Sequence, residues 1–271
     1  MSRDPDELSL STQVLRGGSL AGPPGTPVVH PLTQSANYVQ AVGTTDGLLY
    51  PRYGNTPNAD SVQRRLAAIE GAEAALVLSS GMGATACALL ALLRPGDHLL
   101  ASKWLYGGVR RLLQTEFATL GIHVTFVDPM ETRGWRRRLR QDTRAIFVET
   151  PTNPTCRVLD LRPISVLTAE VGLALVVDST FASPVNLQPM RHGADVVIHS
   201  ATKYLNGHND ILAGVVPGTA SYIEEVRQKM ILWGQSRQTR SPCWLLERGL
   251  KTLDVRIQRQ NAERRPHRGV V

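Results

Sequence analysis

The residue whose chemistry stands out first is a lysine that follows an apolar strand. Residues 196–198 are apolar, and they lead through Ser200 and Thr202 to Lys203. An amine at the end of a buried strand is unusual unless it is used, because burial lowers the pKa of a lysine and makes its amine nucleophilic. The alternative is a surface lysine whose apolar stem packs while its amine reaches water. The pattern alone leaves these two interpretations level.

A second feature is a turn of small residues between a strand and a helix, at residues 79–84. Small residues let the backbone approach an anion, and the free N–H groups at the start of a helix point at it. The spacing Gly81-x-Gly83-x-x-Ala86 also matches a dinucleotide-binding turn, but the next strand lacks the terminal acid that a ribose requires. The turn therefore predicts a phosphate site, with tight packing as the alternative.

A third feature is an acid, Asp178, that closes the apolar run 173–177. Taken alone, such an acid is more simply a turn or helix-cap residue. Together with the anion site and Lys203, however, it would lie at the carboxyl edge of one sheet, where open α/β folds bind ligands. Pyridoxal phosphate requires this set of groups: an anion site, a carboxylate for the ring nitrogen and a lysine for a Schiff base.

The elements that must position these residues alternate along the chain. We predict strands at 74–79, 98–101, 124–128, 145–149, 174–178 and 196–199, and helices at 58–70, 83–93, 109–120, 135–141, 164–171, 221–233 and 242–262. Strands that are almost wholly apolar belong in a sheet covered on both faces, with the helices as crossovers. The sequence therefore predicts an α/β fold with a mostly parallel sheet flanked by helices.

Composition narrows the function classes. The 271 residues carry 30 Lys+Arg and 23 Asp+Glu, a formal charge of +7, and 42% are hydrophobic, as in ordinary globular proteins. No membrane span or signal peptide is expected, and three widely spaced cysteines argue against a metal site and for a cytoplasmic location. Much of the excess positive charge lies in 135–140 and 263–268, which are typical of solvated faces. A nucleic-acid-binding module is the weaker alternative.

The segment 200–208 reads Ser-Ala-Thr-Lys-Tyr-Leu-Asn-Gly-His. It closely resembles the lysine motif of the Cys/Met-metabolism family of pyridoxal-phosphate enzymes. That family includes cystathionine γ-synthases, cystathionine γ- and β-lyases, methionine γ-lyases and homoserine-ester sulfhydrylases. Further segments agree with the family in order and spacing: 50–55, 80–82, 106–108, 149–154 and 178–181. The resemblance covers residues 10 to 262 and implies the large domain of the aspartate-aminotransferase-like fold.

The resemblance implies a role for each matching position. Lys203 would hold the cofactor as a Schiff base and then act as a mobile acid and base, and Tyr106 would stack on the ring and assist proton transfer. The other implied cofactor contacts are Asp178 at the ring nitrogen, Asn153 at the 3′ oxygen, Gly81, Met82, Ser200 and Thr202 at the phosphate, Thr180 beside them, and Tyr50 and Arg52 at the phosphate of a neighbouring subunit.

The resemblance also implies how the chain is organised: an extended N-terminal arm at 1–57, a cofactor-binding domain at 58–245, and the start of a connecting helix with a tail at 246–271. Chains of the family continue into a smaller C-terminal domain that grips the substrate carboxylate. Here the resemblance ends in an Arg/Pro-rich tail, so we expect a C-terminally truncated chain that lacks this domain.

The implied activity is β- or γ-elimination, or γ-replacement, on sulfur amino acids or O-acylhomoserine. The substrates would be of the cystathionine, O-acylhomoserine and cysteine class, and the enzyme would be a homodimer or homotetramer without membrane or nucleic-acid partners. The alternative that the tail suggests is a cofactor-binding remnant with impaired catalysis.

Overall fold

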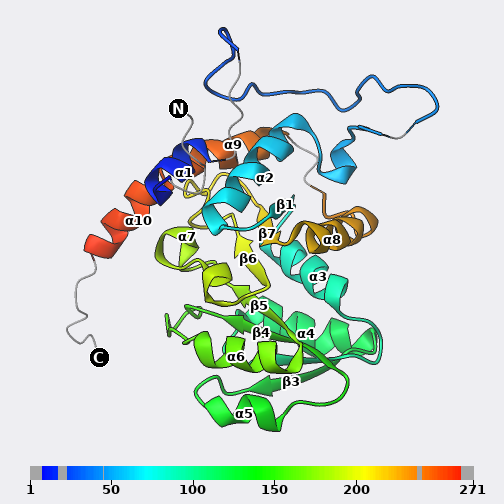
Figure 1. The fold of residues 1–271 in the computed structure, drawn as a ribbon, viewed down its shortest axis with the longest axis vertical. Helices are drawn as coiled ribbons and strands as arrows, with labels where there is room; N and C mark the ends of the chain where they lie inside the picture. The colour runs from blue at the N-terminus through cyan, green and yellow to red at the C-terminus, as the bar shows by residue number, and fades with distance from the viewer. Residues whose placement is uncertain (1–7, 18–22, 45, 237–239, 264–271) are drawn as a thin grey trace.

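A computed structural model describes residues 8–17, 23–44, 46–236 and 240–263 (Figure 1). The helices are α1 (Leu10–Arg16), α2 (Pro57–Glu70), α3 (Gly81–Leu92), α4 (Gly107–Thr119), α5 (Thr132–Arg137), α6 (Arg162–Val171), α7 (Ser183–Asn186), α8 (Ala220–Leu232), α9 (Arg240–Leu250) and α10 (Leu253–Ala262), with 3-10 turns η2 (Pro51–Tyr53) and η3 (Pro189–His192). The strands are β1 (Ala74–Leu78), β2 (His98–Ser102), β3 (His123–Val127), β4 (Thr143–Glu149), β5 (Ala174–Asp178), β6 (Val196–Ser200) and β7 (Gly214–Gly218).

The strands form a 7-stranded sheet in the order β1-β7-β6-β5-β4-β2-β3. Strands β2 to β6 pair in parallel, whereas β7 runs antiparallel to both of its neighbours, β1 and β6. The predicted mostly parallel sheet is therefore confirmed, together with the six predicted strands. The sequence prediction missed β7, because its Gly214, Pro217 and Gly218 interrupt the apolar pattern.

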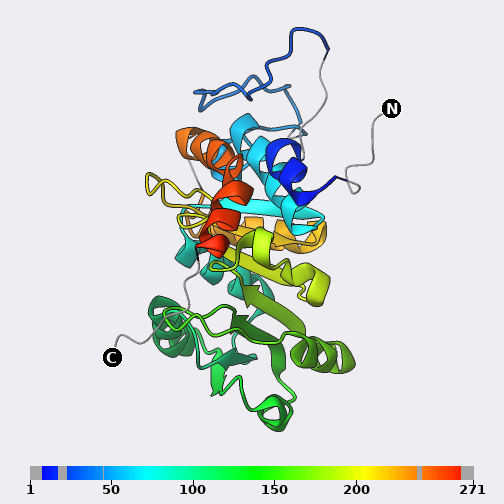
Figure 2. The ribbon, with the colours of Figure 1, turned by 90° about the vertical axis from the view of Figure 1, so that its left-hand side faces the viewer.

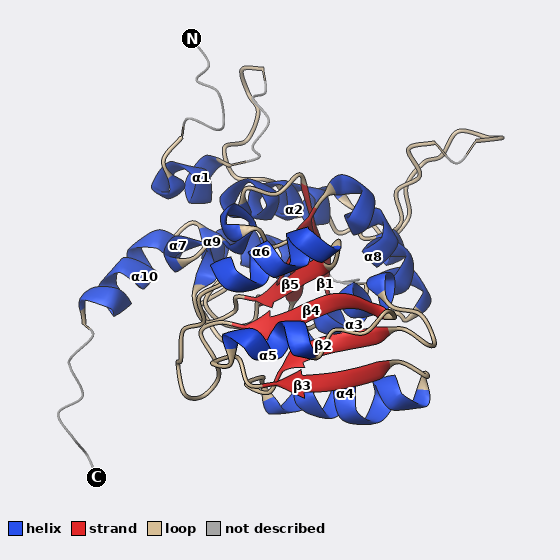
Figure 3. Cartoon of the chain, turned by 60° about the horizontal axis from the view of Figure 1, so that its bottom comes forward, coloured by secondary structure: helices blue, strands red, loops and turns tan. Residues whose placement is uncertain are grey.

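Both faces of the sheet are covered, as Figure 3 shows. Alternate strand residues point to opposite sides: Phe147 packs in the cluster that contains α3, α4 and α8, while Ile146 and Val148 pack in the cluster beneath α6. A third cluster joins α1, α2, α9 and α10 at the β1–β7 end of the sheet. This double burial explains why the parallel strands read as continuous apolar runs.

The helix expected at 242–262 is two helices, α9 and α10, which meet at residues 251–252. Gly249 packs so tightly on the loop that carries Lys203 that an added Cβ would lie 2.4 Å from the Asn206 carbonyl oxygen. The guanidinium of Arg256 then donates hydrogen bonds to the carbonyls of Gly249 (3.0 Å) and Tyr204 (2.8 Å). The break thus lets both helices contact the lysine-bearing loop. The helix expected at 135–141 is shifted to Thr132–Arg137.

The N-terminal arm extends from the body of the protein in both Figure 1 and Figure 2. Its described part contains helix α1 and the 3-10 turn η2, where the sequence predicted only extended chain; Val14 of α1 is buried against α2. Farther along, Asn58 binds the arm through the Thr33 N–H (2.9 Å) and the Pro31 carbonyl (2.8 Å). The arm also exposes apolar side chains, among them Val39 and Val42.

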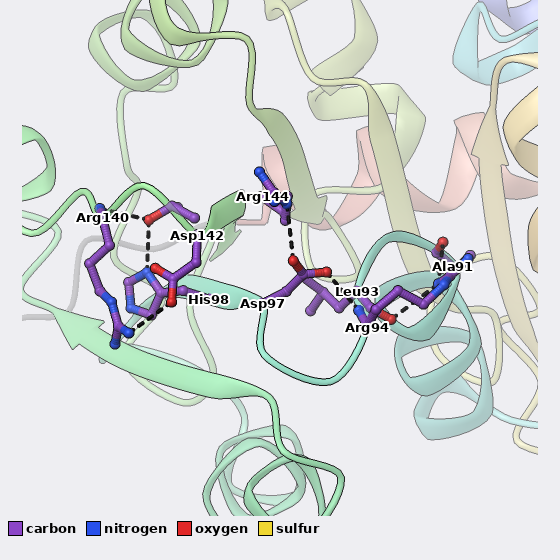
Figure 4. A network of polar contacts seen from close by, with 9 residues as sticks. Ala91, Leu93, Arg94, Asp97, His98, Arg140, Asp142 and Arg144 are labelled. Atoms are coloured by element: carbon purple, nitrogen blue, oxygen red, sulfur yellow. Dashed lines mark hydrogen bonds and ion pairs between the residues drawn. The ribbon is translucent and has the colours of Figure 1, made fainter.

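The opposite edge of the sheet, at the amino ends of the strands, is held by the polar network in Figure 4. The N–H of His98 donates to the Asp142 carbonyl at 2.8 Å, and its buried ring contacts the hydroxyls of Thr143 (2.8 Å) and Thr125 (2.9 Å). Asp142 and Arg140 form an ion pair beside it.

Among the described residues, no helix has the length and apolar character needed to cross a membrane.

Candidate active site

A cavity of about 270 Å³ opens at the carboxyl ends of the parallel strands, the edge that the sequence predicted for a ligand. Its volume suits one small molecule. It is lined by Ser80, Gly81, Met82, Thr85, Tyr106, Val109, Glu149, Asn153, Asp178, Thr180, Phe181, Ser200, Thr202, Lys203 and Leu212. Nine of the eleven sequence-predicted site residues are in this lining; Tyr50 and Arg52 are the two that are not.

One wall is the start of α3. Two amides at the start of this helix are hydrogen-bonded to Ser80. The Ala84 N–H donates to the Ser80 carbonyl at 2.9 Å, and the Gly83 N–H donates to the Ser80 hydroxyl at 3.0 Å. The Gly81 and Met82 amides come before these bonds, so they are available at the positive end of the helix dipole. The turn that the sequence predicted to bind an anion therefore lies in the cavity wall.

The end of β6 closes against this helix. An added Cβ on Gly81 would lie 2.8 Å from the Ser200 Cβ, so only glycine fits there without a shift. The Ser200 N–H donates to the Thr180 hydroxyl at 2.8 Å, which fixes the strand end beside the loop after β5. The Thr202 hydroxyl exchanges hydrogen bonds with the Ala213 backbone at 3.0 and 3.3 Å. Hydroxyl groups thus surround the anion site on its second side.

Asp178 forms the floor of the cavity. It is 9% exposed, and its carboxylate accepts the Thr180 N–H at 2.9 Å. Burial raises the pKa of this carboxyl above its ordinary value, although the Thr180 bonds and the charge of nearby His199 oppose the rise. A buried acid of this kind favours a ligand that brings an N–H donor or a positive charge.

A second acid, Glu149, stands at the end of β4. It is 5% exposed, and its two carboxylate oxygens accept the N–H groups of Tyr106 (2.6 Å) and Asn153 (2.8 Å). Burial, and then the neighbouring Asp178, raise the pKa of Glu149 to about 7. The sequence analysis did not single out this residue. The signal that could have found it is the one used for Asp178, an acid that closes an apolar strand.

Tyr106 stands at the mouth of the cavity, just before α4, and is 48% exposed. Gly108 lies close behind its ring, because an added Cβ would be 2.7 Å from the Tyr106 Cε1 atom and 3.3 Å from the Met82 sulfur. The absence of a side chain at position 108 therefore makes room for the ring at its observed place.

Lys203 lines the cavity and is exposed, as in the surface-lysine interpretation of the sequence and unlike the buried-amine interpretation. It lies in the turn that follows the strand, where its N–H donates to the Ser200 carbonyl at 3.0 Å and its carbonyl accepts from Gly207 at 2.7 Å. The side chain that this turn carries is both part of the cavity lining and accessible to solvent. Its amine is thus near the site without being enclosed by the described residues.

Tyr50 and Arg52 lie in and beside η2, away from the cavity lining. The Arg52 guanidinium stacks over the Tyr50 ring at 5.4 Å, and its backbone carbonyl accepts the Ser236 hydroxyl. Within one chain, these two residues are therefore not brought to the other predicted site residues.

The chain is similar in sequence and in structure to known proteins. The family model for Cys/Met metabolism PLP-dependent enzymes matches residues 11–265. The chain is 35% identical to an L-methionine gamma-lyase of Porphyromonas gingivalis, covering 92% of this chain and 64% of that protein. It is 37% identical to a probable cystathionine gamma-synthase of Herpetosiphon aurantiacus, covering 85% and 72%. The crystal structure of metB from Corynebacterium glutamicum superposes with a TM-score of 0.88 at 34% identity, covering 93% of this chain and 66% of that one. The chain thus spans about two thirds of the length of these relatives.

Proposed function

Since the chain belongs to the Cys/Met metabolism family of PLP-dependent enzymes, we propose that it acts on sulfur amino acids or O-acylhomoserine by β- or γ-elimination or by γ-replacement. Cystathionine, O-acylhomoserine and cysteine-like amino acids are the proposed substrates. The single observation that carries the proposal is one cavity that gathers a helix-end anion site, a buried acid and a lysine.

The cofactor of this family is pyridoxal 5′-phosphate, and the residues present fit it. The amides of Gly81 and Met82, with the hydroxyls of Ser200 and Thr202, offer donors for a phosphate. Asp178 is a buried carboxyl whose raised pKa makes it a ready partner for a ring N–H. When bound, the cofactor supplies an electron sink that stabilises negative charge at the α carbon of an amino acid.

The chain's own residues would then hold the reactants and move protons. Lys203 would hold the cofactor's aldehyde through Nζ and, once displaced by substrate, would take the α proton and return it. Asp178 would keep the ring nitrogen protonated. Tyr106 would cover the ring face, and Asn153 and Thr180 would bind beside it. These roles rest on the family motif together with the shared cavity.

Tyr50 and Arg52 would serve the cavity of a second copy, since neither lines the cavity of its own chain. A planar guanidinium suits bidentate phosphate binding, which would give the arm a function in a homodimer or homotetramer.

For the organisation of the chain, we propose the division into an arm (1–57), a cofactor domain (58–245) and a connecting segment (246–271). A cytoplasmic location also stays a prediction from the sequence.

A cofactor-binding protein with little turnover is the second candidate. The observation that favours it is the exposure of Lys203 and Tyr106, both of which line the cavity. A site that does not exclude water or orient its substrate loses several orders of magnitude in rate.

The first test is covalent capture. Reduction of the PLP-loaded chain with borohydride, followed by peptide mass mapping, should place the tag on Lys203, and Lys203→Ala should lose both the tag and the yellow colour. Lys103→Ala is the matched control, since Lys103 also follows a parallel strand but pairs with Asp128 outside the cavity. A tag on another amine, or none, contradicts the cofactor assignment.

The second test separates the two candidates. PLP-loaded protein is mixed with cystathionine, and the release of thiol, ammonia and 2-oxo acid is measured. It is also mixed with O-acetylhomoserine, with and without cysteine, and the release of acetate is measured. Turnover that Lys203→Ala abolishes supports the enzyme. Cofactor capture at Lys203 without turnover supports the second candidate instead.

A further inference from the structure

Glu149 connects two segments that both line the cavity and are far apart in the chain. One carboxylate oxygen accepts the N–H of Tyr106 at 2.6 Å, at the start of α4, and the other accepts the N–H of Asn153 at 2.8 Å, in the loop after β4. The acid itself is 5% exposed and belongs to the rigid end of β4, where it pairs in register with Asp178. A fixed strand end therefore holds two loops through one side chain.

We propose that Glu149 is a positioning residue that sets the places of Tyr106 and Asn153 around the bound cofactor through their backbone N–H groups. This inference rests on the proposed function, because the roles of Tyr106 and Asn153 at the cofactor are part of that proposal. It adds a residue that neither touches the ring in the proposed roles nor moves a proton.

The chemistry of the two bonds requires a carboxylate of this length. An ionised Glu accepts through both oxygens, and hydrogen bonds to a charged acceptor are about twice as strong as neutral ones. A Gln would offer one oxygen and one NH₂ group, so one backbone N–H would face another donor. An Asp is one methylene shorter and would not reach both N–H groups from the same strand position.

The acid is an unfavourable choice if it served only the fold. Its burial and the neighbouring Asp178 both oppose ionisation, and they raise its pKa to about 7. A group held against such opposition in a cavity is characteristic of functional sites rather than of stabilising contacts. Stability and cofactor binding should therefore respond differently when the acid is replaced.

The experiment compares Glu149→Gln with Asp128→Asn. Asp128 is the matched control because it also follows a parallel strand, β3, but pairs with Lys103 away from the cavity. The readouts are the apparent Kd for PLP, the visible circular dichroism of each bound PLP, and the urea midpoint of the PLP-free protein. Loss of one charge-assisted hydrogen bond predicts about ten- to hundredfold weaker PLP binding by Glu149→Gln. We also expect a smaller circular dichroism signal per cofactor and an unchanged or higher urea midpoint, with Asp128→Asn binding PLP as the wild type does.

A double-mutant cycle tests the route of the effect. If Glu149 acts through the Tyr106 ring, Glu149→Gln should weaken PLP binding less in a Tyr106→Ala background than in the wild type. Fully additive losses, or wild-type PLP affinity and circular dichroism in Glu149→Gln, would overturn the proposal.

The remaining outcomes are also decisive. A fall in PLP affinity that only parallels a fall in the urea midpoint would show that the acid serves the fold. Unfolding of both Glu149→Gln and Glu149→Asp would show the same and overturn the positioning role. Failure of the wild type to bind PLP at all would instead sink the proposed function, which the Lys203 capture experiment detects separately.

Discussion

Glu149 and Asp178 lie directly opposite each other in the register of the parallel strands β4 and β5. Both carboxyl groups line the cavity, and each has a pKa raised primarily by burial. Two desolvated acids at one sheet edge repel each other when both are ionised. A ligand that brings a positive charge or an N–H donor to this edge would relieve the repulsion. Without such a ligand, the repulsion and the burial of the two acids lower the stability of the protein.

This loss of stability should depend on pH. Folding raises the pKa of Glu149 from 4.5 to about 7, so the folded state binds the proton more tightly than the unfolded state. The stabilising effect of the protonated acid is then present below about pH 4.5 and is lost as the pH rises through about 7. As the pH rises from about 5 to about 8, the free energy of unfolding of PLP-free Glu149→Gln should rise by about 2–3 kcal/mol relative to that of the wild type, as measured by urea unfolding. A difference that stays constant with pH contradicts this.

The sequence predicted the parallel strands because each is apolar throughout and is buried on both faces, so local pattern and tertiary environment agree. It missed β7, since Gly214 and Pro217 mark a loop in sequence. In the fold, the backbone of β7 passes very close to the start of α3: an added Cβ on Gly214 would lie 2.1 Å from the Ser80 carbonyl oxygen. A glycine is therefore needed at this position of the strand. This close approach is a tertiary property that no local window contains.

The candidate site divides in the same way. Lys203, Asp178 and the α3 turn were predictable, because each is the end of a local strand pattern. Glu149 acquires its meaning from Tyr106, which is 43 positions away in the chain. The exposure of Lys203 likewise depends on the turn that follows β6, and the place of Tyr50 and Arg52 outside their own cavity depends on the path of the arm.

Gly108 provides a test of the Tyr106 ring position. Gly108→Ala would place a Cβ 2.7 Å from the Tyr106 Cε1 atom, forcing the ring from its observed place. A displaced side chain costs about 0.5–1.5 kcal/mol, so PLP affinity should fall about two- to tenfold while helix α4 itself gains from the better helix former. Gly107→Ala is the matched control, since an added Cβ there meets no atom within 4 Å. Equal PLP titrations for the two variants would contradict the steric role of position 108.

The buried ion pair between α2 and α9 makes a stability prediction. The guanidinium of Arg65 lies 3.2 Å from the Glu247 carboxylate, with both side chains about 5–6% exposed, and it also donates to the Val14 carbonyl at 3.0 Å. Glu247→Ala should destabilise the protein by about 3–5 kcal/mol, because it removes one partner of a buried ion pair. Arg65→Met combined with Glu247→Leu should recover most of that loss.

The exposed pair of Arg136 and Glu170 is the control for this measurement. Glu170→Ala should change the free energy of unfolding by about 1 kcal/mol or less, as surface pairs do. Urea unfolding of the wild type and the three variants checks the comparison. Similar losses for Glu247→Ala and Glu170→Ala would mean that the burial of the α2–α9 pair has no energetic consequence.

His98, at the opposite edge of the sheet, should give a pH dependence of the other sign. Its pKa is lowered from 6.5, chiefly by burial and then by Arg140, because both disfavour a charged ring between the Thr125 and Thr143 hydroxyls. The unfolded state therefore binds the proton more tightly, and the stability that neutral His98 provides is full above 6.5 and is lost as the pH falls through the lowered pKa. His98→Asn loses hydrogen bonds but cannot titrate, so it should be about 1–2 kcal/mol less stable than the wild type at about pH 8, with the gap closing in acid. His192→Asn, at an exposed 3-10 turn, is the control substitution of the same type. A gap for His98→Asn that persists undiminished in acid would show that the ring takes up its proton as readily in the folded state as in the unfolded one.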